Sequence, residues 1–369
     1  MSDLYIGLMS GTSLDGVDAV LADFSGPRCQ VLRHHALGFD PDLRSELLAL
    51  NTSGADELHR AALAANALAR CYAQAVQAVL QAADIPASAV QAIGAHGQTV
   101  RHRPGAFDGT GYTLQLNNPA LLAECTGIRV VADLRSRDVA AGGQGAPLVP
   151  AFHRFQFGQP GQEALVLNIG GIANLSVLRA DGSVLGFDCG PGNALMDHWC
   201  QQHRGEPFDR DGAWAASGQV LPALLQQMQA EPYLHQSPPK STGRDLFNPS
   251  WLEQHLRHCP SASAVDVQAT LLELTASACA ESAVRYQKNS ILLAVCGGGA
   301  FNGRLMARLQ ALLPNLRVQP TDALGLPAQQ VEAAAFAWLA RQCLLGLPGN
   351  LPSATGAQGA RVLGAIYPA

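Results

Sequence analysis

The chain has 369 residues, of which 48% are hydrophobic and 14% charged, and its formal net charge is −5. This length predicts two domains with sizeable cores, and the absence of a basic stripe excludes a nucleic-acid-binding surface. No apolar run approaches a membrane span, and Met1-Ser2-Asp3 leads into a strand without the features of a signal peptide. We therefore expect a cytoplasmic protein with a small-molecule partner and no membrane partner.

The opening segment combines glycines, hydroxyls and carboxylates between two apolar stretches. Strand, tight polar turn and strand is the predicted structure for Gly7-Leu8-Met9-Ser10-Gly11-Thr12-Ser13-Leu14-Asp15-Gly16-Val17-Asp18. Glycines let backbone N–H groups approach a phosphate, and hydroxyls supply further donors. Glycine and Asp also form ordinary hairpin turns. On these residues alone, a phosphate loop and a plain hairpin both remain open.

Several elements follow in the first half of the chain. A long Ala- and Leu-rich helix is predicted from about Glu57 to Ala83. Short strands are predicted at Val90–Ala95, ending at His96-Gly97-Gln98-Thr99, and at Arg129–Ala132, ending at Asp133. Polar residues at strand ends are typical of ligand sites in α/β proteins.

Arg135, Arg137 and Asp138 follow the second of these strands and precede the glycine-rich segment 140–145. An arginine at this position could bind a substrate carboxylate through paired hydrogen bonds. A salt bridge within the protein is the alternative.

The opening pattern returns near residue 164. A strand at Ala164–Ile169, a turn at Gly170–Asn174 and a strand at Leu175–Leu178 form a second glycine-rich hairpin. Two such hairpins, each opening a strand-and-helix half, predict a duplicated α/β architecture. Later helices are predicted at Gly212–Ala230, Val265–Gln287 and Pro327–Leu345.

Asp188 lies at the end of a short strand, before Gly190-Pro191-Gly192-Asn193, which opens a helix. A carboxylate exposed at a strand end suits a general base acting on a water or a hydroxyl. A helix cap is the alternative. Because Asn193 and Asp197 are equally available for capping, we favour the base.

Two further sites lie in the last third of the chain. A third glycine turn, Cys296–Asn302, joins the strand Ile291–Val295 to a helix near Gly303. It suits close approach of an adenosine as well as a tight strand–helix junction. Glu332, in an Ala-rich helix, faces either a pocket or solvent.

The nine cysteines show no C-x-x-C pair and are predicted to be reduced and mostly buried. His255, His258 and Cys259 have a spacing that suits zinc. A solvated helix face is favoured, because a closed zinc site needs a fourth ligand that is not visible nearby.

Together these segments closely resemble the anhydro-N-acetylmuramic acid kinase family of bacterial peptidoglycan recycling, within the sugar kinase, Hsp70 and actin superfamily. The resemblance covers essentially the whole chain in order. It is carried by Gly7–Asp18, Ala95–Thr99, Asp133–Arg135 through Ala146–Pro150, Asn168–Asn174, Phe187–Asn193, Lys240–Asp245, Gly297–Asn302 and Gln330–Ala333.

The resemblance implies an α/β fold of two ribonuclease-H-like domains flanking a deep nucleotide cleft. Residues 1–145 would form the N-terminal domain, with the first phosphate loop and part of the sugar site. Residues 146–369 would form the C-terminal domain, with the second phosphate loop, the catalytic Asp and the adenosine turn. The chain's end would either stay there or pack back on the first domain.

The resemblance also implies a homodimer that uses ATP and Mg²⁺. The implied reaction opens the anhydro bridge of 1,6-anhydro-N-acetylmuramic acid with water and phosphorylates the released oxygen, which gives N-acetylmuramic acid 6-phosphate. One alternative is a kinase for a free hydroxyl of another amino sugar. The other is an ATP-dependent binding protein like actin or a chaperone, which the absence of a separate peptide-binding domain disfavours.

By the family's pattern, Asp188 is the catalytic base. The substrate-binding residues would be His96, Gln98, Arg135, Asp188 and Glu332. The ATP-binding residues would be Gly11, Thr12, Ser13, Leu14, Asp15, Gly16, Val17, Asp18, Gly170, Gly171, Asn174, Gly297, Gly298, Gly299 and Asn302.

The chain departs from the pattern at two positions. Cys189 stands where the family segment is expected to carry Thr, a small-for-small change that should leave Asp188 in place. Ile6-Gly7 lacks the Asp found before this glycine in other kinases of the superfamily. Magnesium would then be held largely by phosphates and water, near Asp15 or Asp18, and no metal ligand is assigned.

Overall fold

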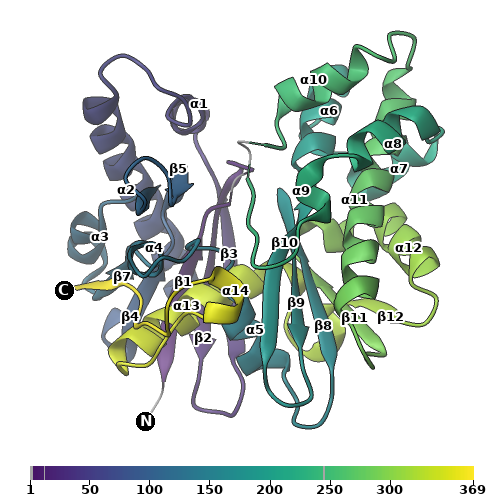
Figure 1. Ribbon diagram of the computed structural model, residues 1–369. Helices are drawn as coiled ribbons and strands as arrows, with labels where there is room; N and C mark the ends of the chain where they lie inside the picture. The colour runs from purple at the N-terminus through teal and green to yellow at the C-terminus, as the bar shows by residue number, and fades with distance from the viewer. Residues whose placement is uncertain (1–2, 12, 244–245) are drawn as a thin grey trace. The chain divides into compact units, whose positions relative to one another are not determined.

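The protein's computed structural model describes residues 3–11, 13–243 and 246–369. The chain divides into two compact units (Figure 1). Unit 1 comprises Met1–Gln156 and Gln330–Ala369, and unit 2 comprises Phe157–Gln329. These bounds differ from the expected domains 1–145 and 146–369, because residues 146–156 and 330–369 both belong to unit 1. The second of these ranges corresponds to the alternative in which the chain's end packs on the first domain. There the last strand, β13 (Ala365–Tyr367), pairs with β7 (Val130–Ala132).

Unit 1 is built on a six-stranded sheet in the order β13-β7-β4-β1-β2-β3. Its other strands are β1 (Leu4–Met9), β2 (Gly16–Asp23), β3 (Gln30–Gly38) and β4 (Val90–Ala95), with a separate hairpin of β5 (Gln98–Pro104) and β6 (Gly111–Leu116). Its helices are α1 (Pro41–Ala49), α2 (Glu57–Ala83), α3 (Pro119–Thr126), α4 (Ser136–Ala140), α13 (Val331–Leu344) and α14 (Pro352–Thr355). Helix α5 (Val149–Phe157) ends at the boundary of the unit.

Unit 2 is built on a five-stranded sheet in the order β10-β9-β8-β11-β12. The strands are β8 (Ala164–Ile169), β9 (Ile172–Leu178), β10 (Val184–Pro191), β11 (Leu292–Cys296) and β12 (Arg317–Pro320). The helices are α6 (Ala194–Arg204), α7 (Ala213–Ala216), α8 (Pro222–Gln229), α9 (Pro232–His235), α10 (Pro249–Leu256), α11 (Ala264–Tyr286) and α12 (Gly303–Leu312).

Apart from β13, the two sheets share one topology, which confirms the predicted duplication. Each begins with three antiparallel strands, β1-β2-β3 in unit 1 and β8-β9-β10 in unit 2. In each, two further strands then add in parallel beside the first strand, β4 and β7 in unit 1 and β11 and β12 in unit 2. This order and direction are those of the ribonuclease-H-like fold, so the predicted α/β class with two such domains is correct.

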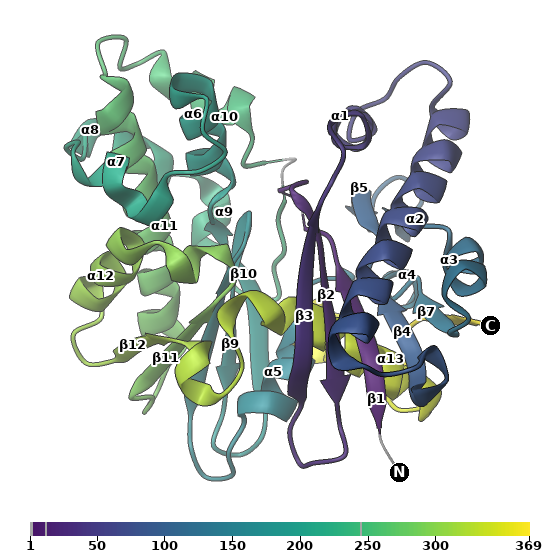
Figure 2. The same ribbon diagram turned by 180° about the vertical axis from the view of Figure 1, so that it is seen from behind.

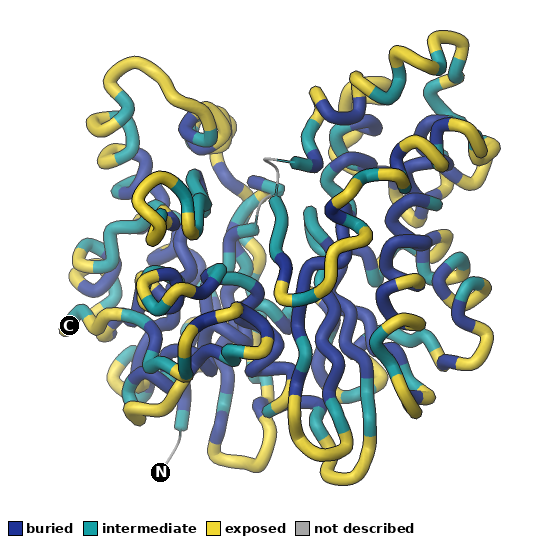
Figure 3. The backbone as a smooth tube through the Cα atoms, in the orientation of Figure 1, coloured by how far each residue is buried: buried dark blue, intermediate teal, exposed yellow. Residues whose placement is uncertain are grey.

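Helices cover both faces of the unit 1 sheet. Ile6 and Leu8 of β1 and Ile93 of β4 join the cluster that includes Leu68 and Tyr72 of α2. The alternate residues Gly7 and Gly94 face α13 instead, because successive strand residues point to opposite faces. Figure 2 shows α2 and α13 on opposite sides of this sheet. The strands and the helix faces that pack on them are largely buried in both units (Figure 3).

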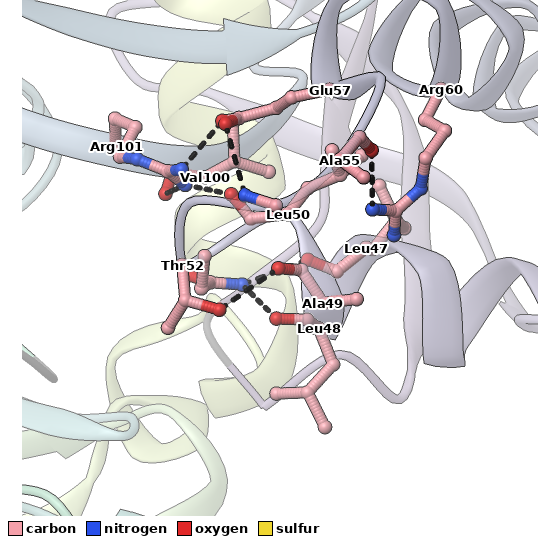
Figure 4. A network of polar contacts seen from close by, with 12 residues as sticks. Leu47, Leu48, Ala49, Leu50, Thr52, Ala55, Glu57, Arg60, Val100 and Arg101 are labelled. Carbon is pink, nitrogen blue, oxygen red and sulfur yellow. Dashed lines mark hydrogen bonds and ion pairs between the residues drawn. The ribbon is translucent and has the colours of Figure 1, made fainter.

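A polar network holds the β5–β6 hairpin to the loop between α1 and α2 (Figure 4). The Arg101 guanidinium donates to the Glu57 carboxylate, with Nη2 2.5 Å from Oε1, and to the Leu50 carbonyl. The Arg101 side chain is mostly buried, so this ion pair fixes the hairpin more firmly than an exposed pair would.

The predicted helix at Gly212–Ala230 is wrong, because this segment forms α7 and α8 with a break between them. A Cβ at Gly218 would lie 2.4 Å from the backbone oxygen of Val265, so the chain passes close to α11 at this point. Pro222 then begins α8, where its missing N–H costs nothing. Close tertiary approach therefore outweighs the continuous helical pattern.

All nine cysteines are free, and six of them are buried, as predicted. Within the described residues, no group of three or more His, Cys, Asp and Glu side chains could hold a metal. Among the same residues, no helix has both the length and the apolar character needed to cross a bilayer.

Candidate functional site

A row of polar residues crosses the unit 2 sheet near one edge. Asn174 of β9 lies opposite Asn168 of β8 and opposite Asp188 of β10, while Cys296 of β11 lies beside Asn168. The residues that flank this row in sequence belong to the hydrophobic core on the helix-covered face. Because side chains alternate along a strand, the row lies on the other face. Strands β8, β10 and β11 run in the same direction, so their carboxyl ends meet at this edge.

Asp188 is held at three points by α9 and the segment that follows it. Its carboxylate Oδ2 accepts the Thr242 backbone N–H at 3.0 Å. Its own N–H donates to the Lys240 carbonyl at 3.2 Å, and its carbonyl accepts the Tyr233 hydroxyl at 3.0 Å. The residue is only 5% exposed. The carboxylate position is therefore set by backbone and side-chain contacts rather than by a mobile surface rotamer.

Lys240 contacts α9, which holds Tyr233 against Asp188. Its buried ammonium donates to the carbonyls of Tyr233 and Leu234, at 3.1 and 3.2 Å, and lies 4.7 Å from the Tyr233 ring centroid. Burial lowers the pKa of Lys240, and nearby Asp188 opposes that shift. Burial raises the pKa of Tyr233, and Asp188 adds to the rise. Tyr233 therefore stays a neutral hydroxyl donor.

The helix-cap alternative for Asp188 is wrong. Strand β10 continues to Pro191, and α6 begins only at Ala194 with Asn193 as its N-cap residue. The Asn193 side chain turns back to the Ile169 carbonyl at 3.1 Å, and the Asp188 carboxylate accepts from a loop N–H instead. Asp188 therefore does not cap a helix.

The second glycine hairpin is hydrogen-bonded to the residues that precede α6. The Gly170 carbonyl accepts the Asn193 N–H at 2.8 Å, and the Gly171 carbonyl accepts the Gly192 N–H at 3.0 Å. A Cβ at Gly192 would lie 2.2 Å from the Gly170 oxygen, whereas one at Gly170 would have no neighbour nearer than 3.7 Å. Gly192 is therefore required for packing, and Gly170 leaves open space that a ligand can approach.

The third glycine turn divides in the same way. A Cβ at Gly297 would lie 2.4 Å from Asn168 Oδ1, and one at Gly299 would lie 2.5 Å from the Ile169 side chain. Gly298 is exposed and lies near the Asn193 amide. Asn302 caps α12 through its Oδ1, which accepts the Leu305 N–H at 3.0 Å. Packing accounts for Gly297 and Gly299, while Gly298 is exposed, although a Cβ there would lie 3.3 Å from Asn193 Nδ2.

In unit 1, the opening segment forms the predicted strand–turn–strand, with Met9 opposite Asp18. Thr12 lies outside the described residues. The side chains of Leu14 and Val17 are in the core, so only their backbone is left to contact a nucleotide. Gly16 is required by β3, because a Cβ there would lie 2.3 Å from the Leu37 oxygen.

The polar side chains of this turn are engaged locally. Ser13 Oγ donates to Asp15 Oδ1 at 2.7 Å. Asp18 Oδ1 lies 2.8 Å from His34 Nε2. A Cβ at Gly11 would have no neighbour nearer than 3.6 Å. Gly11 is thus the open glycine of this turn, and Asp15 is exposed although it is bonded to Ser13.

His96 and Gln98 lie directly against this hairpin. Gln98 Nε2 donates to the Gly11 carbonyl at 3.0 Å, and His96 Nδ1 lies 3.2 Å from the Ser10 carbonyl. Ser10 Oγ donates in turn to the Gly97 carbonyl at 3.0 Å and contacts the Tyr72 hydroxyl at 2.7 Å. The end of β4 and the end of β1 therefore form one hydrogen-bonded unit.

Arg135 is anchored between His96 and the glycine-rich segment. Its Nε and Nη2 lie 3.1 and 2.9 Å from His96 Nε2, and its Nη1 donates to the Gly145 carbonyl at 2.7 Å. Burial and the Arg135 charge hold the pKa of His96 well below its usual range. A neutral His96 therefore accepts from Arg135 at Nε2 and donates from Nδ1 to the Ser10 carbonyl.

Glu332 lies in the first turn of α13, partly buried. Phe336, one turn further along that helix, has its ring centroid 4.7 Å from that of His96. Residues four apart share one helix face, so Glu332 lies on the face that meets His96. The structure thus brings His96, Gln98 and Arg135 together and places Glu332 on the neighbouring helix face.

Two buried histidines predict a loss of stability at acid pH. Burial lowers the pKa of His153 to about 3, and the pKa of His96 is lowered as well. Below about pH 6.5 the unfolded chain binds protons that the folded chain does not. Each histidine therefore lowers the free energy of unfolding by about 1.4 kcal/mol for every pH unit by which the pH falls. Denaturant unfolding between pH 7.5 and 5 should show this slope. It should be about 1.4 kcal/mol per pH unit smaller in His153→Phe, and an unchanged slope would contradict the account.

Each unit has a hairpin glycine that leaves room for a ligand. These are Gly11 in unit 1 and Gly170 in unit 2, where a Cβ would have no neighbour nearer than 3.6 and 3.7 Å. Asn174 adds a buried side-chain oxygen without a partner in the structure. For magnesium, Asp15 and Asp18 are the carboxylates of the first hairpin, and within the described residues no ready-made cluster of metal ligands accompanies them.

Sequence reasoning assigned no role to several residues that hold the site. Lys240 and Thr242 were noted only as part of a motif, and Tyr233 was not noted at all. The sequence around Lys240 is polar and Pro-rich, so no local pattern marks this lysine as buried. Tyr233 and Asp138 carried no local signal, since their partners are distant in sequence.

Comparison with known proteins gives a consistent result. A sequence profile of one family, described as anhydro-N-acetylmuramic acid kinase, matches residues 3–369. Two proteins of that name are each 64% identical to this chain: one from Albidiferax ferrireducens, aligned over 100% of both chains, and one from Variovorax paradoxus, aligned over 100% of this chain and 99% of the relative. A third, from Pseudomonas putida, is 55% identical over 99% of both.

Proposed function

The chain belongs to the anhydro-N-acetylmuramic acid kinase family, and from this we propose that it catalyses the reaction for which the family is named. The substrate is 1,6-anhydro-N-acetylmuramic acid, whose internal bridge is opened by water while the released oxygen is phosphorylated. The product is N-acetylmuramic acid 6-phosphate. The observation that carries the proposal is the buried Asp188 carboxylate, fixed in a polar row at the edge of the unit 2 sheet.

The chemistry of the substrate requires such a base. A bridged sugar has no free hydroxyl at the position to be phosphorylated, so water must attack the anomeric carbon as the bridge oxygen departs. Asp188 accepts one proton from this water, and the departing oxygen takes the γ-phosphoryl group of ATP. Attack from the face opposite the bridge inverts the anomeric carbon, as in single-displacement glycosidases.

We propose that Arg135 binds the lactyl carboxylate of the sugar, with His96, Gln98 and Glu332 completing the site. The Arg135 guanidinium is held by His96 on one side and by the Gly145 carbonyl on another, which gives its plane one orientation. A planar donor fork of fixed orientation suits paired hydrogen bonds to a carboxylate. The neutral state of His96 leaves the arginine as the local positive charge.

A kinase family implies ATP as phosphoryl donor, and bound ATP supplies the γ-phosphoryl group. We propose that Mg²⁺ accompanies it, near Asp15 or Asp18. Within unit 1, the backbone of 11–18 would bind phosphate. Within unit 2, phosphate would be bound by Gly170, Gly171 and Asn174, and Gly297–Gly299 with Asn302 would lie near the adenosine. The open space at Gly11 in unit 1 and at Gly170 in unit 2, together with the exposure of Gly298, supports this assignment.

The cellular setting is part of the same proposal. The substrate is a fragment of peptidoglycan, so the enzyme would act in cell-wall recycling in the cytoplasm. A homodimer is proposed from the family resemblance, and light scattering of the purified protein would test it.

Turnover with two sugars tests the proposed activity. ATP consumption should depend on the anhydro sugar, with little turnover on free N-acetylmuramic acid, because the free sugar has no bridge to open. Turnover on the free sugar alone would instead identify a kinase for a sugar hydroxyl. ATP hydrolysis without either sugar would point to an ATP-dependent binding protein.

A further inference from the structure

We propose that Asp138 is a positioning residue that acts on the sugar site through Gly145 and Arg135. It fixes the orientation of the Arg135 guanidinium and thereby sets the preference for a sugar that carries a carboxylate. This inference rests on the proposed role of Arg135 as the carboxylate-binding residue. The evidence is a continuous chain of contacts within unit 1.

Asp138 is a fully buried carboxylate with three hydrogen-bond donors around it. Its Oδ1 accepts the Asn350 side-chain amide at 2.6 Å and the Thr355 hydroxyl at 2.7 Å. Its Oδ2 accepts the Gly145 backbone N–H at 2.8 Å. Its exposure is 0%. Burying a carboxylate is costly unless it is well bonded, so its presence calls for an explanation beyond packing.

The glycine-rich segment 142–145 wraps around this carboxylate. A Cβ at Gly143 would lie 2.3 Å from Asp138 Oδ2, so only glycine fits there. Gly145 has φ +67°, a backbone conformation that favours glycine. The segment is also bonded to α14, because the Gln144 N–H donates to the Thr355 carbonyl at 2.7 Å. Its path is thus defined by Asp138 and by residues more than 200 positions later in the sequence.

Gly145 transmits this position to Arg135. Its N–H is held by the Asp138 carboxylate, and its carbonyl accepts Arg135 Nη1 at 2.7 Å. The other side of the guanidinium is held by His96. With Asp138 in place, Gly145 has one position, and the guanidinium plane has one orientation. Without the carboxylate, the Gly145 carbonyl is free to shift, and the Arg135 guanidinium loses its single orientation.

Two ligands that differ only in the carboxylate test this role. Dissociation constants are measured by calorimetry without ATP for 1,6-anhydro-N-acetylmuramic acid and for 1,6-anhydro-N-acetylglucosamine, which lacks the lactyl ether. Asp138→Asn should weaken binding of the first about tenfold and change binding of the second less than about twofold, since a bond to a charged group is at stake. A general structural defect would weaken both equally.

Matched variants keep the test decisive. Thr355→Val removes one of the three donors at similar volume and should show the same selective loss on a smaller scale, even where Asp138→Asn folds poorly. Asp108→Asn is the control, because Asp108 also accepts two loop N–H groups, from Thr110 and Gly111, but is exposed. It should change neither constant.

Arg135→Ala distinguishes carboxylate binding by Arg135 from the positioning role of Asp138. This variant should abolish the difference between the ligands, and adding Asp138→Asn to it should have no further selective effect. Selectivity lost in Arg135→Ala but kept in Asp138→Asn and Thr355→Val would overturn the positioning role alone. Selectivity kept in Arg135→Ala would overturn the assignment of Arg135, and the positioning role with it.

Discussion

Asp188→Asn is expected to lower sugar-dependent ATP turnover by about 10²–10⁴-fold, the usual contribution of a general base. The amide cannot accept the water's proton, but its oxygen can still accept the Thr242 N–H that holds the carboxylate at 3.0 Å. The backbone contacts to Tyr233 and Lys240 do not involve the side-chain carboxylate. The fold and the ATP affinity should therefore stay near those of the unmodified protein, and calorimetric titration with a non-hydrolysable ATP analogue measures the latter.

Asp181→Asn is the matched control for this substitution. Asp181 is an exposed carboxylate of the same unit, bonded only within its own turn to Ser183. Its replacement should leave both turnover and ATP affinity unchanged. Strong residual turnover in Asp188→Asn would contradict the base role, and a parallel loss of ATP binding would point to a structural one.

Gly7→Ala is expected to lower the free energy of unfolding by about 3 kcal/mol or more, at the upper end of what overpacking costs. A Cβ at this position would lie 1.8 Å from the backbone oxygen of Ala333 and 2.7 Å from the backbone N of Ala337, both in α13. Gly94 lies beside Gly7 in the neighbouring strand and meets the Phe336 oxygen in the same way. The glycine pair lets α13 rest directly on the sheet. Backbone atoms cannot rotate away, so the helix itself must shift.

Gly26→Ala provides the comparison in the same unit. A Cβ at Gly26 would have no neighbour nearer than 3.7 Å, so its free energy of unfolding should change by less than about 1 kcal/mol. Chemical denaturation of both variants measures the difference. Equal stability of Gly7→Ala and Gly26→Ala would show that the close contact with α13 is absent in solution.

Local patterns were sufficient for much of the fold. The apolar repeat of α2 defined its ends at Glu57 and Ala83, and the strand at Val90–Ala95 matches β4. Both glycine hairpins were visible because turn residues interrupt strongly apolar strands. The repetition of the hairpin was enough to predict duplication, which the two sheet orders confirm.

The remaining features depend on contacts between distant segments. The alignment of Asn168, Asn174 and Asp188 requires the strand register, which no single strand specifies. No local pattern predicts that Asp138 is buried, because its partners Asn350 and Thr355 lie far along the chain. Gly7 stood in the glycine-rich opening segment and Gly192 in the segment predicted to open a helix, and only the folded structure shows that close packing requires both.

The central claim is that water, activated by Asp188, opens the anhydro bridge while the bridge oxygen is phosphorylated. Turnover in ¹⁸O-labelled water followed by mass spectrometry of the sugar phosphate, with the product's anomeric exchange followed in parallel, tests it most directly. One solvent oxygen should appear at the anomeric carbon in each turnover, and the phosphoester oxygen should be unlabelled. Product without solvent oxygen at the anomeric carbon would contradict the account.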